Sequence, residues 1–438
     1  MNKNFLFFAA VPLFLACNGQ TKESTANADS TAIDTGKKQA LNLPAPDEKA
    51  AKTNFSKVIG WPAGKTPVAP EGFTVTKFAG EMKSPRNIYI APNGDILVVL
   101  SNSERNTKEK IANALSGKDK AEVSGSSANT VLLFRDSNKD GKFELKTTFL
   151  SGLDQPYGAL IIGDSFYVAN TDGLYKYPYH TGDTKITGKG QKIVDLPAGG
   201  YNNHWTRNLI ANKDNSKIYI TVGSGSNVGE NGMENELRRA NILEVNPDGT
   251  GEKIYAAGLR NPVGVAWAPG TNVLWTAVNE RDGLGDDLVP DYITSVKPGA
   301  FYGWPYSYYG QNVDPRMKGQ HPELVKAAVV PDLAVGSHTA SLGLAFYTGT
   351  KFADKYQGGA FIGQHGSWNR SELAGYKVAF VPFKNGKPGE LEDFLTGFIA
   401  DKTKSEVYGR PVGVAVANDG ALLVADDVSG IIWRVAAK

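Results

Sequence analysis

The sequence predicts an all-β protein, a six-bladed β-propeller of four-stranded antiparallel blades. Three observations support this prediction. Gly (49) and Pro (23) together make up about one residue in six of the 438, against roughly one in eight in an average protein. From residue 73 onward, short apolar runs alternate with turns of Gly, Asn, Asp and Pro. A similar unit recurs six times in this stretch, as expected of a radial array of small sheets.

Each recurring unit consists of a polar residue, a short apolar strand, a turn and a second apolar strand. In chain order the six units span residues 85–99, 155–170, 207–223, 260–279, 341–364 and 410–426. Strands expected at 73–78 and 431–435 would close the ring. A β-sandwich would also explain short strands, but not the polar residue that opens each unit. The one fair helix candidate, 106–115, lies within an insertion.

Residues 1–16 predict a lipoprotein signal peptide. Lys3 precedes an apolar run, residues 5–16, that is too short for a permanent membrane-spanning helix. The run leads into the single cysteine, Cys17, and its last residues resemble a bacterial lipobox. Cys17 is therefore expected to carry a lipid in the bacterial cell envelope, and Asn18 after it favours the periplasmic side of the outer membrane. The alternative is a free cysteine buried in an ordinary helix.

Composition sets the remaining boundaries. After Cys17 the chain is rich in small and polar residues, which cannot bury enough surface to offset their ordering entropy. Residues 17–70 are therefore expected to form the lipidated cysteine and a flexible tether, and 71–438 the propeller. Lys and Arg (47) nearly balance Asp and Glu (45), which argues against a broad cationic face for nucleic acid.

The polar residues that open the units predict a binding pocket. In a propeller, Gln155, Arg207, Arg260 and Arg410 would converge around the central channel. Several guanidinium groups in one place repel one another unless an anion lies among them, so a phosphate or polycarboxylate ligand is implied. The alternative is that each Arg pairs with a carboxylate on the rim.

His204 is the candidate general base, because it stands three residues before Arg207 and its ordinary pKa lies near neutrality. A lone loop histidine is more often a bystander, and three other histidines have no comparable context: His180, His321 and His338.

An acidic loop predicts a cation site. Five carboxylates fall within twelve residues: Glu280, Asp282, Asp286, Asp287 and Asp291. Such oxygen-rich segments suit Ca²⁺, and a solvated acidic loop is the alternative. Residues 136–141 also match the start of a calcium loop, but Thr147 stands where a bidentate Glu is expected, so a hairpin turn explains that segment equally well.

Three motifs together carry a family resemblance. The segments Arg260-Asn261-Pro262-x-Gly264, 279–287 and Tyr302-Gly303-Trp304-Pro305 resemble the quinoprotein glucose/sorbosone dehydrogenase family, especially its sorbosone dehydrogenase branch. The resemblance extends, with insertions, over residues 73–435. It implies a six-bladed propeller that holds pyrroloquinoline quinone (PQQ) and Ca²⁺, with a histidine that takes the proton of a sugar hydroxyl while hydride passes to the quinone.

The resemblance also implies residue roles. His204 would be the base, and Arg260 would lie beside the reactive quinone carbonyl. The candidate cofactor-binding residues are Gln155, Arg207, Asn261, His365, Arg370 and Arg410. The candidate metal-binding residues are Asp282 and Gly283 through their backbone, with Glu280, Asp286 and Asp287.

Two positions depart from the glucose branch. There, an Asp after Thr-x-Gly supports the histidine, but here Ser224 follows Gly223, so the partner of His204 is not predicted. A cofactor-binding Lys of the fifth blade is also missing, and His365 or Arg370 are the candidates to replace it.

The predicted activity is oxidation of the C1 hydroxyl of an aldose or of a hydrated sugar aldehyde such as a sorbosone. The electron acceptor, a quinone or a cytochrome, is not specified by the sequence. Two other functions stay open, a metal-dependent lactonase and a non-catalytic tethered binding propeller. A lactonase would need acidic and amide groups around an axial metal, whereas the axial candidates are mostly Arg, Gln and His.

Overall fold

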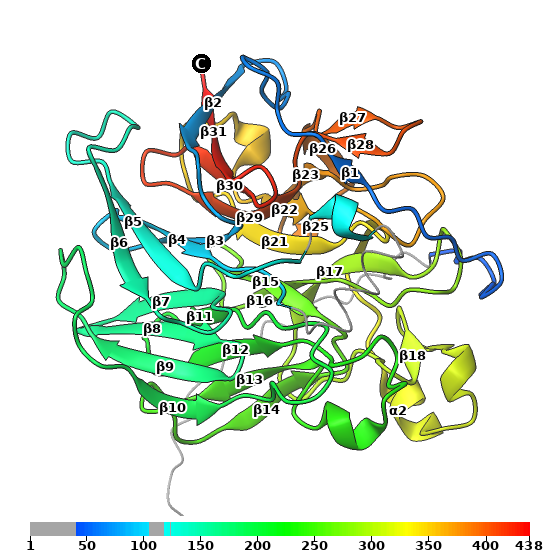
Figure 1. Ribbon diagram of the computed structural model, residues 1–438. Helices are drawn as coiled ribbons and strands as arrows, with labels where there is room; N and C mark the ends of the chain where they lie inside the picture. Colours follow the sequence, from blue (N-terminus) through cyan, green and yellow to red (C-terminus); the bar gives the residue numbers. More distant parts are fainter. Residues whose placement is uncertain (1–40, 105–117, 123) are drawn as a thin grey trace, which may run out of the picture. The chain divides into compact units, whose positions relative to one another are not determined.

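The computed structural model describes residues 41–104, 118–122 and 124–438. Within them, six four-stranded antiparallel sheets form the blades of a β-propeller (Figure 1). From the inside outward, blade one consists of β3 (Pro85–Ile90), β4 (Ile96–Leu100), β5 (Thr130–Arg135) and β6 (Leu145–Ser151). Blade two consists of β7 (Gly158–Ile162), β8 (Ser165–Asn170), β9 (Gly173–Pro178) and β10 (Gln191–Asp195). Blade three consists of β11 (Leu209–Ala211), β12 (Ile218–Val222), β13 (Asn241–Val245) and β14 (Lys253–Ala257).

Blades four to six follow the same order, and the sixth takes its outer strand from the start of the domain. Blade four consists of β15 (Pro262–Trp267), β16 (Leu274–Val278), β17 (Pro290–Val296) and β20 (Leu333–Ser337). Blade five consists of β21 (Ser341–Phe346), β22 (Ala360–Gln364), β23 (Lys377–Val381) and β26 (Glu392–Leu395). Blade six consists of β29 (Pro411–Val416), β30 (Leu422–Asp426), β31 (Ile431–Ala437) and β2 (Phe73–Ala79). The β2–β31 pairing joins the two ends of the domain, so the predicted closure is confirmed.

The first strands of the six blades contact one another in turn and form the inner wall of the ring, β3–β7–β11–β15–β21–β29–β3. Glycines permit this close approach. A Cβ on Gly343 or Gly363 would overlap the carbonyl oxygen of Val412 in the next blade, and one on Gly413 would lie 2.7 Å from Arg86 O. Glycine in these strands is therefore required by the approach of a neighbouring backbone.

Apolar residues close the channel and fill the gaps between blades. Tyr157, Trp205, Val263, Leu342 and Val412 form a buried cluster contributed by five blades at the centre of the ring. Six larger clusters lie between successive blades, the one between blades five and six being especially aromatic. The propeller therefore has a packed centre rather than an open pore.

The described part of the expected tether, residues 41–70, packs against the propeller. Leu43 lies on the apolar cluster between blades three and four, and β1 (Lys57–Val58) pairs with β28 (Glu406–Val407). The ring of Trp61 contacts the rings of Tyr408 and Trp433. The packed chain thus begins before the expected boundary at residue 71, because large apolar side chains upstream of it find partners.

The signal peptide at 1–16, Cys17, the tether as far as residue 40 and the helix candidate at 106–115 lie outside the described residues and stay predictions. In the part of the chain that is described, no helix is long and apolar enough to cross a membrane.

Candidate active site at the axial rim

The predicted polar residues gather at one end of the inner strands. In each blade the start of the first strand pairs with the end of the second, as Pro85 does with Leu100 and Pro411 with Asp426. Residues just before first strands and just after second strands therefore share one end, which we call the axial rim. The predicted residues on it are Gln155, His204, Arg207, Arg260, Asn261, His365 and Arg410. Arg370 lies farther along the loop that follows β22.

The contacts of His204 define its tautomer. Its Nδ1 lies 2.9 Å from both the carbonyl oxygen and the Oγ of Ser224, and its Nε2 lies 3.4 Å from Nδ2 of Asn203. A carbonyl oxygen only accepts and an amide nitrogen only donates. Nδ1 therefore carries the proton and Nε2 presents a lone pair. The partner of His204 that the sequence leaves open is Ser224.

The electrostatic surroundings keep His204 neutral. Burial and the positive charge of Arg260, with smaller contributions from Arg207 and Arg239, lower the pKa of His204 well below its ordinary value. The ring is thus uncharged at neutral pH, with a single proton on Nδ1. A neutral imidazole with an unprotonated Nε2 can accept a proton, as a general base must.

All five N–H groups of the Arg260 side chain donate hydrogen bonds within the protein. A guanidinium group has five N–H donors, and five acceptors surround this one: Asn227 O (3.1 Å), Asn227 Oδ1 (2.8 Å), Asn279 O (3.1 Å), Glu280 O (2.6 Å) and Asp282 Oδ2 (3.3 Å). No N–H is left for a ligand. The direct cofactor contact implied by the resemblance is therefore not available in this arrangement, and Arg260 acts on His204 through its charge.

His338 is a rim residue that the sequence did not predict. Its Nδ1 lies 3.2 Å from Oδ1 of Asp282 and its Nε2 lies 2.9 Å from Gly285 O. Asp282 also pairs with Arg260, so His338 joins blade five to this ion pair. A signal was present, since His338 precedes the unit that starts at Ser341 by the same three residues that separate His204 from Arg207.

His365 and Arg410 form a second group on the rim. His365 Nε2 lies 2.9 Å from Oδ1 of Asp427, which also pairs with Arg86. Arg410 donates to the carbonyl oxygens of His365 (2.9 Å), Gly366 (3.0 Å) and Ala121 (3.4 Å). Among the described residues, its other two N–H groups have no acceptor, so they are available to a ligand. Burial and the charge of Arg410 lower the pKa of His365 below its ordinary value.

Two predicted cofactor residues have structural contacts instead. Arg207 is fully buried and donates to backbone oxygens of His204 and Thr206, among others, so it holds the loop that carries His204. Arg370 donates to Asp286 O (2.7 Å) and pairs with Asp287 Oδ1 (3.2 Å), so it holds the acidic loop.

Gln155 keeps a position from which it can reach a ligand. It is partly buried on the rim, and its Nε2 donates to Asn102 O at 2.9 Å. Asn261 is buried beside His204, since a Cβ on Gly223 would come within 2.5 Å of Asn261 Oδ1 and 2.6 Å of His204 Cβ.

The acidic loop does not form the oxygen cage predicted for Ca²⁺. The carbonyl oxygen of Asp282 accepts from Asn227 Nδ2 (3.0 Å) and Arg281 Nη1 (2.8 Å), and both of its carboxylate oxygens face nitrogen donors of Arg260 and His338. Ca²⁺ takes six to eight oxygens around one point. Here N–H groups already occupy the oxygens of Asp282, so the residues as arranged do not fit the ion.

The other candidate metal-binding residues also make contacts within the protein, which at Gly283 involve the N–H and not the carbonyl oxygen. Glu280 is buried, its Oε2 accepts the backbone N–H of Arg281, and burial raises its pKa to about 7. Gly283 donates its N–H to Asn369 Oδ1 at 2.7 Å. With Asp286 and Asp287 held by Arg370, the loop is a hydrogen-bonded segment rather than a convergent set of carboxylates.

One acidic group does converge, outside the rim. Within the described ranges, Asp136, Asp140 and Glu144 are the one group of three such residues whose ligand atoms all lie within 4.8 Å of one another. Glu144 supplies the third carboxylate of this group. The calcium-loop pattern expects that carboxylate at position 147, where Thr147 stands. Asp136 and Glu144 already accept backbone N–H groups of Gly141 and Ser137, as in a simple turn between β5 and β6.

Unpartnered polar atoms collect on the rim. Of the fifteen buried side-chain atoms that find no hydrogen-bond partner in the described structure, several lie on the rim and come from five blades: Ser101 Oγ, Ser103 Oγ, Asn170 Oδ1, Thr206 Oγ1, Arg207 Nε, Asn261 Oδ1 and Gln364 Oε1. Buried polar atoms are rarely left unpaired, and such groups call for a ligand or water. The rim is therefore suited to a ligand rich in oxygen and nitrogen.

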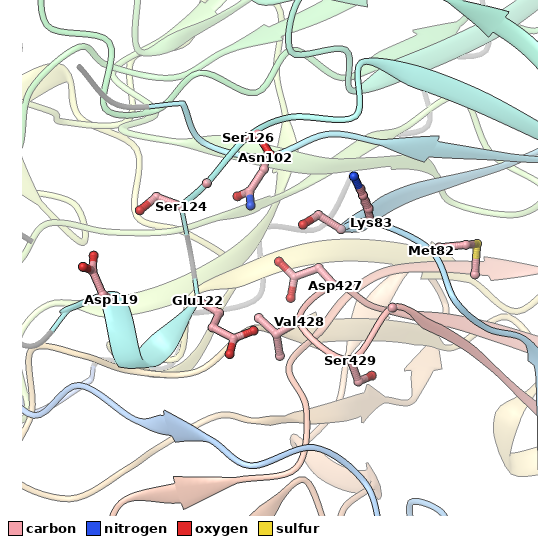
Figure 2. A pocket seen from close by; sticks show the side chains of 13 residues that line it. Met82, Lys83, Asn102, Asp119, Glu122, Ser124, Ser126, Asp427, Val428 and Ser429 are labelled. Carbon is pink, nitrogen blue, oxygen red and sulfur yellow. The ribbon is translucent and has the colours of Figure 1, made fainter. Parts of the chain in front are cut away.

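A cavity of about 390 Å³ opens between blades six and one (Figure 2). Asn102 and Asp427 of the rim line it, together with Asp119 and Glu122 at the insertion. Lys83 is the one cationic side chain in this lining. The cavity is thus more acidic than the arginine-rich pocket that the sequence predicts, and none of the rim arginines is among its lining residues.

The fold and the site define the class, a β-propeller with a neutral, buried histidine at its axial rim. Residues 180–434 match the family model described as Glucose / Sorbosone dehydrogenase. The chain therefore belongs to the glucose/sorbosone dehydrogenase family, as the motifs indicate.

Individual relatives agree with this assignment. An uncharacterized protein of Borreliella burgdorferi is 29% identical over 83% of this chain and 93% of its own length. The pyrroloquinoline quinone-dependent pyranose dehydrogenase of Coprinopsis cinerea is 24% identical over 83% of this chain, which spans about half (54%) of that relative's length. The solved holo form of the PQQ domain of the Coprinopsis cinerea enzyme shares the fold, with 19% identity, a TM-score of 0.67 and coverage of 87% of this chain and all of that domain.

Proposed function

We propose that this protein is a PQQ-dependent sugar dehydrogenase that oxidises the C1 hydroxyl of an aldose or of a hydrated sugar aldehyde such as a sorbosone. The observation that carries the proposal is His204, a neutral histidine on the rim of a propeller of this family, whose unprotonated Nε2 has only a long contact, 3.4 Å, with Asn203 Nδ2 among its hydrogen bonds in the described structure. The names of the Coprinopsis relatives support the class of cofactor and of substrate.

The residues of this chain give the proton a defined route. His204 Nε2 takes the proton of the sugar hydroxyl while Nδ1–H stays on the Ser224 carbonyl. When bound, PQQ supplies the two-electron acceptor for the hydride that leaves C1. Burial and the charge of Arg260 lower the pKa of His204, so the imidazolium formed in this step readily gives up its proton.

Three rim residues are proposed to bind the cofactor. Asn261 has a buried Oδ1 without a partner in the described structure, and Arg410 keeps two N–H groups for a carboxylate. Gln155 stands on the same rim. The oxygens of loop 280–287 do not fit Ca²⁺ as arranged, so the proposed mechanism assigns the ion no step.

The location and the electron acceptor are also proposals. A lipid on Cys17 would hold the propeller at the periplasmic side of the outer membrane. There a quinone or a cytochrome would reoxidise the cofactor.

Titration of the full chain with PQQ tests the function. We expect a change in the quinone absorbance on binding, and reduction of an artificial dye when aldoses or a sorbosone are added. His204→Asn should bind PQQ and fail to turn over, since the base is lost. Absence of both an absorbance change and dye reduction would reject the proposal. A lactonase would instead hydrolyse lactones without PQQ, and a binding propeller would do neither.

A further inference from the structure

We propose that Glu236 is a positioning residue for His204, and that it acts through the turn formed by residues 224–226. The inference rests on the proposed role of His204 as the base. It assigns the carboxylate support that is missing from the position after Gly223, where Ser224 stands.

Glu236 clamps the turn with both carboxylate oxygens. It lies in the 3₁₀ helix η2 (Met233–Glu236) and is 6% exposed. Its Oε1 accepts from the N–H of Ser226 (2.9 Å) and from the Ser226 hydroxyl (2.5 Å), and its Oε2 accepts from the N–H of Gly225 (2.7 Å). Three donors on two adjacent residues fix the turn to one buried charge, and such charge-assisted bonds are among the stronger ones.

The same turn determines how His204 is held. The Ser224 hydroxyl donates to Ser226 O at 2.6 Å, so its proton is committed and its oxygen faces Nδ1 as an acceptor. The Ser224 carbonyl is the second acceptor. The N–H of Asn203 donates to Gly225 O at 3.0 Å, which ties the histidine loop to the turn. A turn held in this geometry keeps the proton on Nδ1 and leaves Nε2 unprotonated.

An indirect carboxylate has a different effect from a direct one. A carboxylate bound to Nδ1 would favour the imidazolium and raise the pKa of the histidine. A carbonyl oxygen orients the ring and selects the same tautomer without adding a negative charge beside it. The arrangement therefore combines a fixed tautomer with a pKa below the ordinary value.

The alternative explanation is a purely structural role for Glu236 as a partner of Arg239. Burial lowers the pKa of Arg239, and the negative charge of Glu236 opposes this effect. The two roles differ in one observable. Only the positioning role predicts that loss of the carboxylate changes the tautomer of His204 while the fold persists.

The test uses nitrogen-15 NMR of the full chain labelled at histidine, without cofactor. The protein has five histidines, and His204→Asn assigns the signal. We expect the wild type to show the Nδ1–H tautomer. In Glu236→Gln one carboxylate oxygen becomes an NH₂ group that faces N–H donors, so the Nε2–H form should become detectable. Glu234→Gln, in the same helix but exposed, is the matched control and should match the wild type.

Turnover provides the second readout. With PQQ bound, Glu236→Gln should lower kcat by about 10- to 100-fold, the loss expected when a hydrogen bond to a buried charge is removed, with little change in KM. Ser226→Ala, which removes one of the three bonds and keeps the carboxylate, should act in the same direction by less. It replaces Glu236→Gln as the test variant if that protein does not fold.

The outcomes separate this inference from the proposed function. An Nε2–H tautomer in the wild type, or an unchanged Nδ1–H signal in Glu236→Gln and Ser226→Ala, would overturn the inference even if the enzyme oxidises sugars. A tautomer change in the variants supports it even if PQQ fails to bind, since the spectra need no cofactor.

Discussion

His204 Nδ1 lies 2.9 Å from the carbonyl oxygen of Ser224, a contact that only an Nδ1–H tautomer can make. The backbone N–H of Ser224 in turn donates to the carbonyl oxygen of Arg260 at 2.7 Å. Ser224 therefore connects the base of blade three to the cation of blade four. The unprotonated Nε2 follows from this contact, and so do the expected effects of changing the histidine.

Replacing His204 by Asn should remove the base and retain the fold. An Asn amide can still donate to the Ser224 carbonyl, but it cannot take a proton from a hydroxyl. We expect kcat with an aldose to fall by about 10²- to 10⁴-fold, the usual contribution of general base catalysis. PQQ affinity, measured by the absorbance titration, should stay within a few-fold. Turnover near the wild-type rate in this variant would exclude His204 as the base.

Acid should destabilise the protein through its buried neutral histidines. The pKa of His204 and that of His365 are lowered by burial and by arginines, so the unfolded chain binds these protons first. Stability is then retained above about pH 6.5 and falls as the pH drops toward the folded values, with His365 at about 4. Each histidine contributes up to about 1.4 kcal/mol per pH unit.

Urea unfolding at several pH values would measure this slope. His365→Asn should make the acid slope shallower, whereas His180→Asn, at an exposed position, should leave it unchanged. Equal slopes in the wild type and His365→Asn would contradict the explanation.

The fold was predictable because its units are local. Each hairpin carries its own turn residues and apolar strands, and glycines such as Gly343 mark where inner strands touch. The closing strand β2 pairs with β31 across the whole chain, yet its apolar pattern predicted it. The packed segment before residue 71 was missed because Trp61, between Gly60 and Pro62, lies in no recognisable strand or helix pattern and finds its partners more than 300 residues away.

The sequence predicted which residues form the site better than it predicted the contacts that these residues make. The unit starts identify His204, Arg260 and Arg410 as neighbours, and the structure places all three on the axial rim. The sequence could not show that Asn227, from a loop of another blade, would accept hydrogen bonds from the side chain of Arg260 and from the backbone N–H of Asp282. A carboxylate is a Ca²⁺ ligand or an ion-pair partner according to what faces it, and that depends on tertiary structure.

Gly363 should tolerate no side chain. A Cβ there, on β22, would overlap the carbonyl oxygen of Val412 on the inner strand β29 of blade six, and both groups lie within packed β-strands. We expect Gly363→Ala to cost about 3 kcal/mol or more, because neither backbone can yield. Gly199→Ala is the matched control, since nothing lies within 4 Å of the added Cβ. Comparable melting temperatures for the two variants would show that the inner strands can separate.

Removing divalent cations should leave the rim intact. The oxygens of Asp282 are bound by protein N–H groups, so EDTA treatment should leave the PQQ titration unchanged. Any rise in melting temperature with Ca²⁺ should come from the exposed group at Asp136, Asp140 and Glu144, and disappear in Asp140→Asn. Loss of PQQ binding in EDTA, with recovery on addition of Ca²⁺, would show that the ion displaces the observed donors.

Trp61 should stabilise the rim from outside the blades. Its Nε1 donates to Oδ2 of Asp426 at 2.8 Å, and Oδ1 of this fully buried carboxylate accepts the backbone N–H of Arg410 at 2.8 Å. Trp61→Phe keeps a ring but leaves the carboxylate one donor short, which typically costs about 1–3 kcal/mol. Trp368→Phe is the control, because Trp368 is partly exposed and stacks on Phe55. A chain that starts at residue 71 should lose at least as much stability as Trp61→Phe, and should bind PQQ more weakly because Asp426, which accepts the backbone N–H of Arg410, loses its Trp61 donor. Equal urea midpoints for this shortened chain and the full chain would mean that the segment before residue 71 is only a tether.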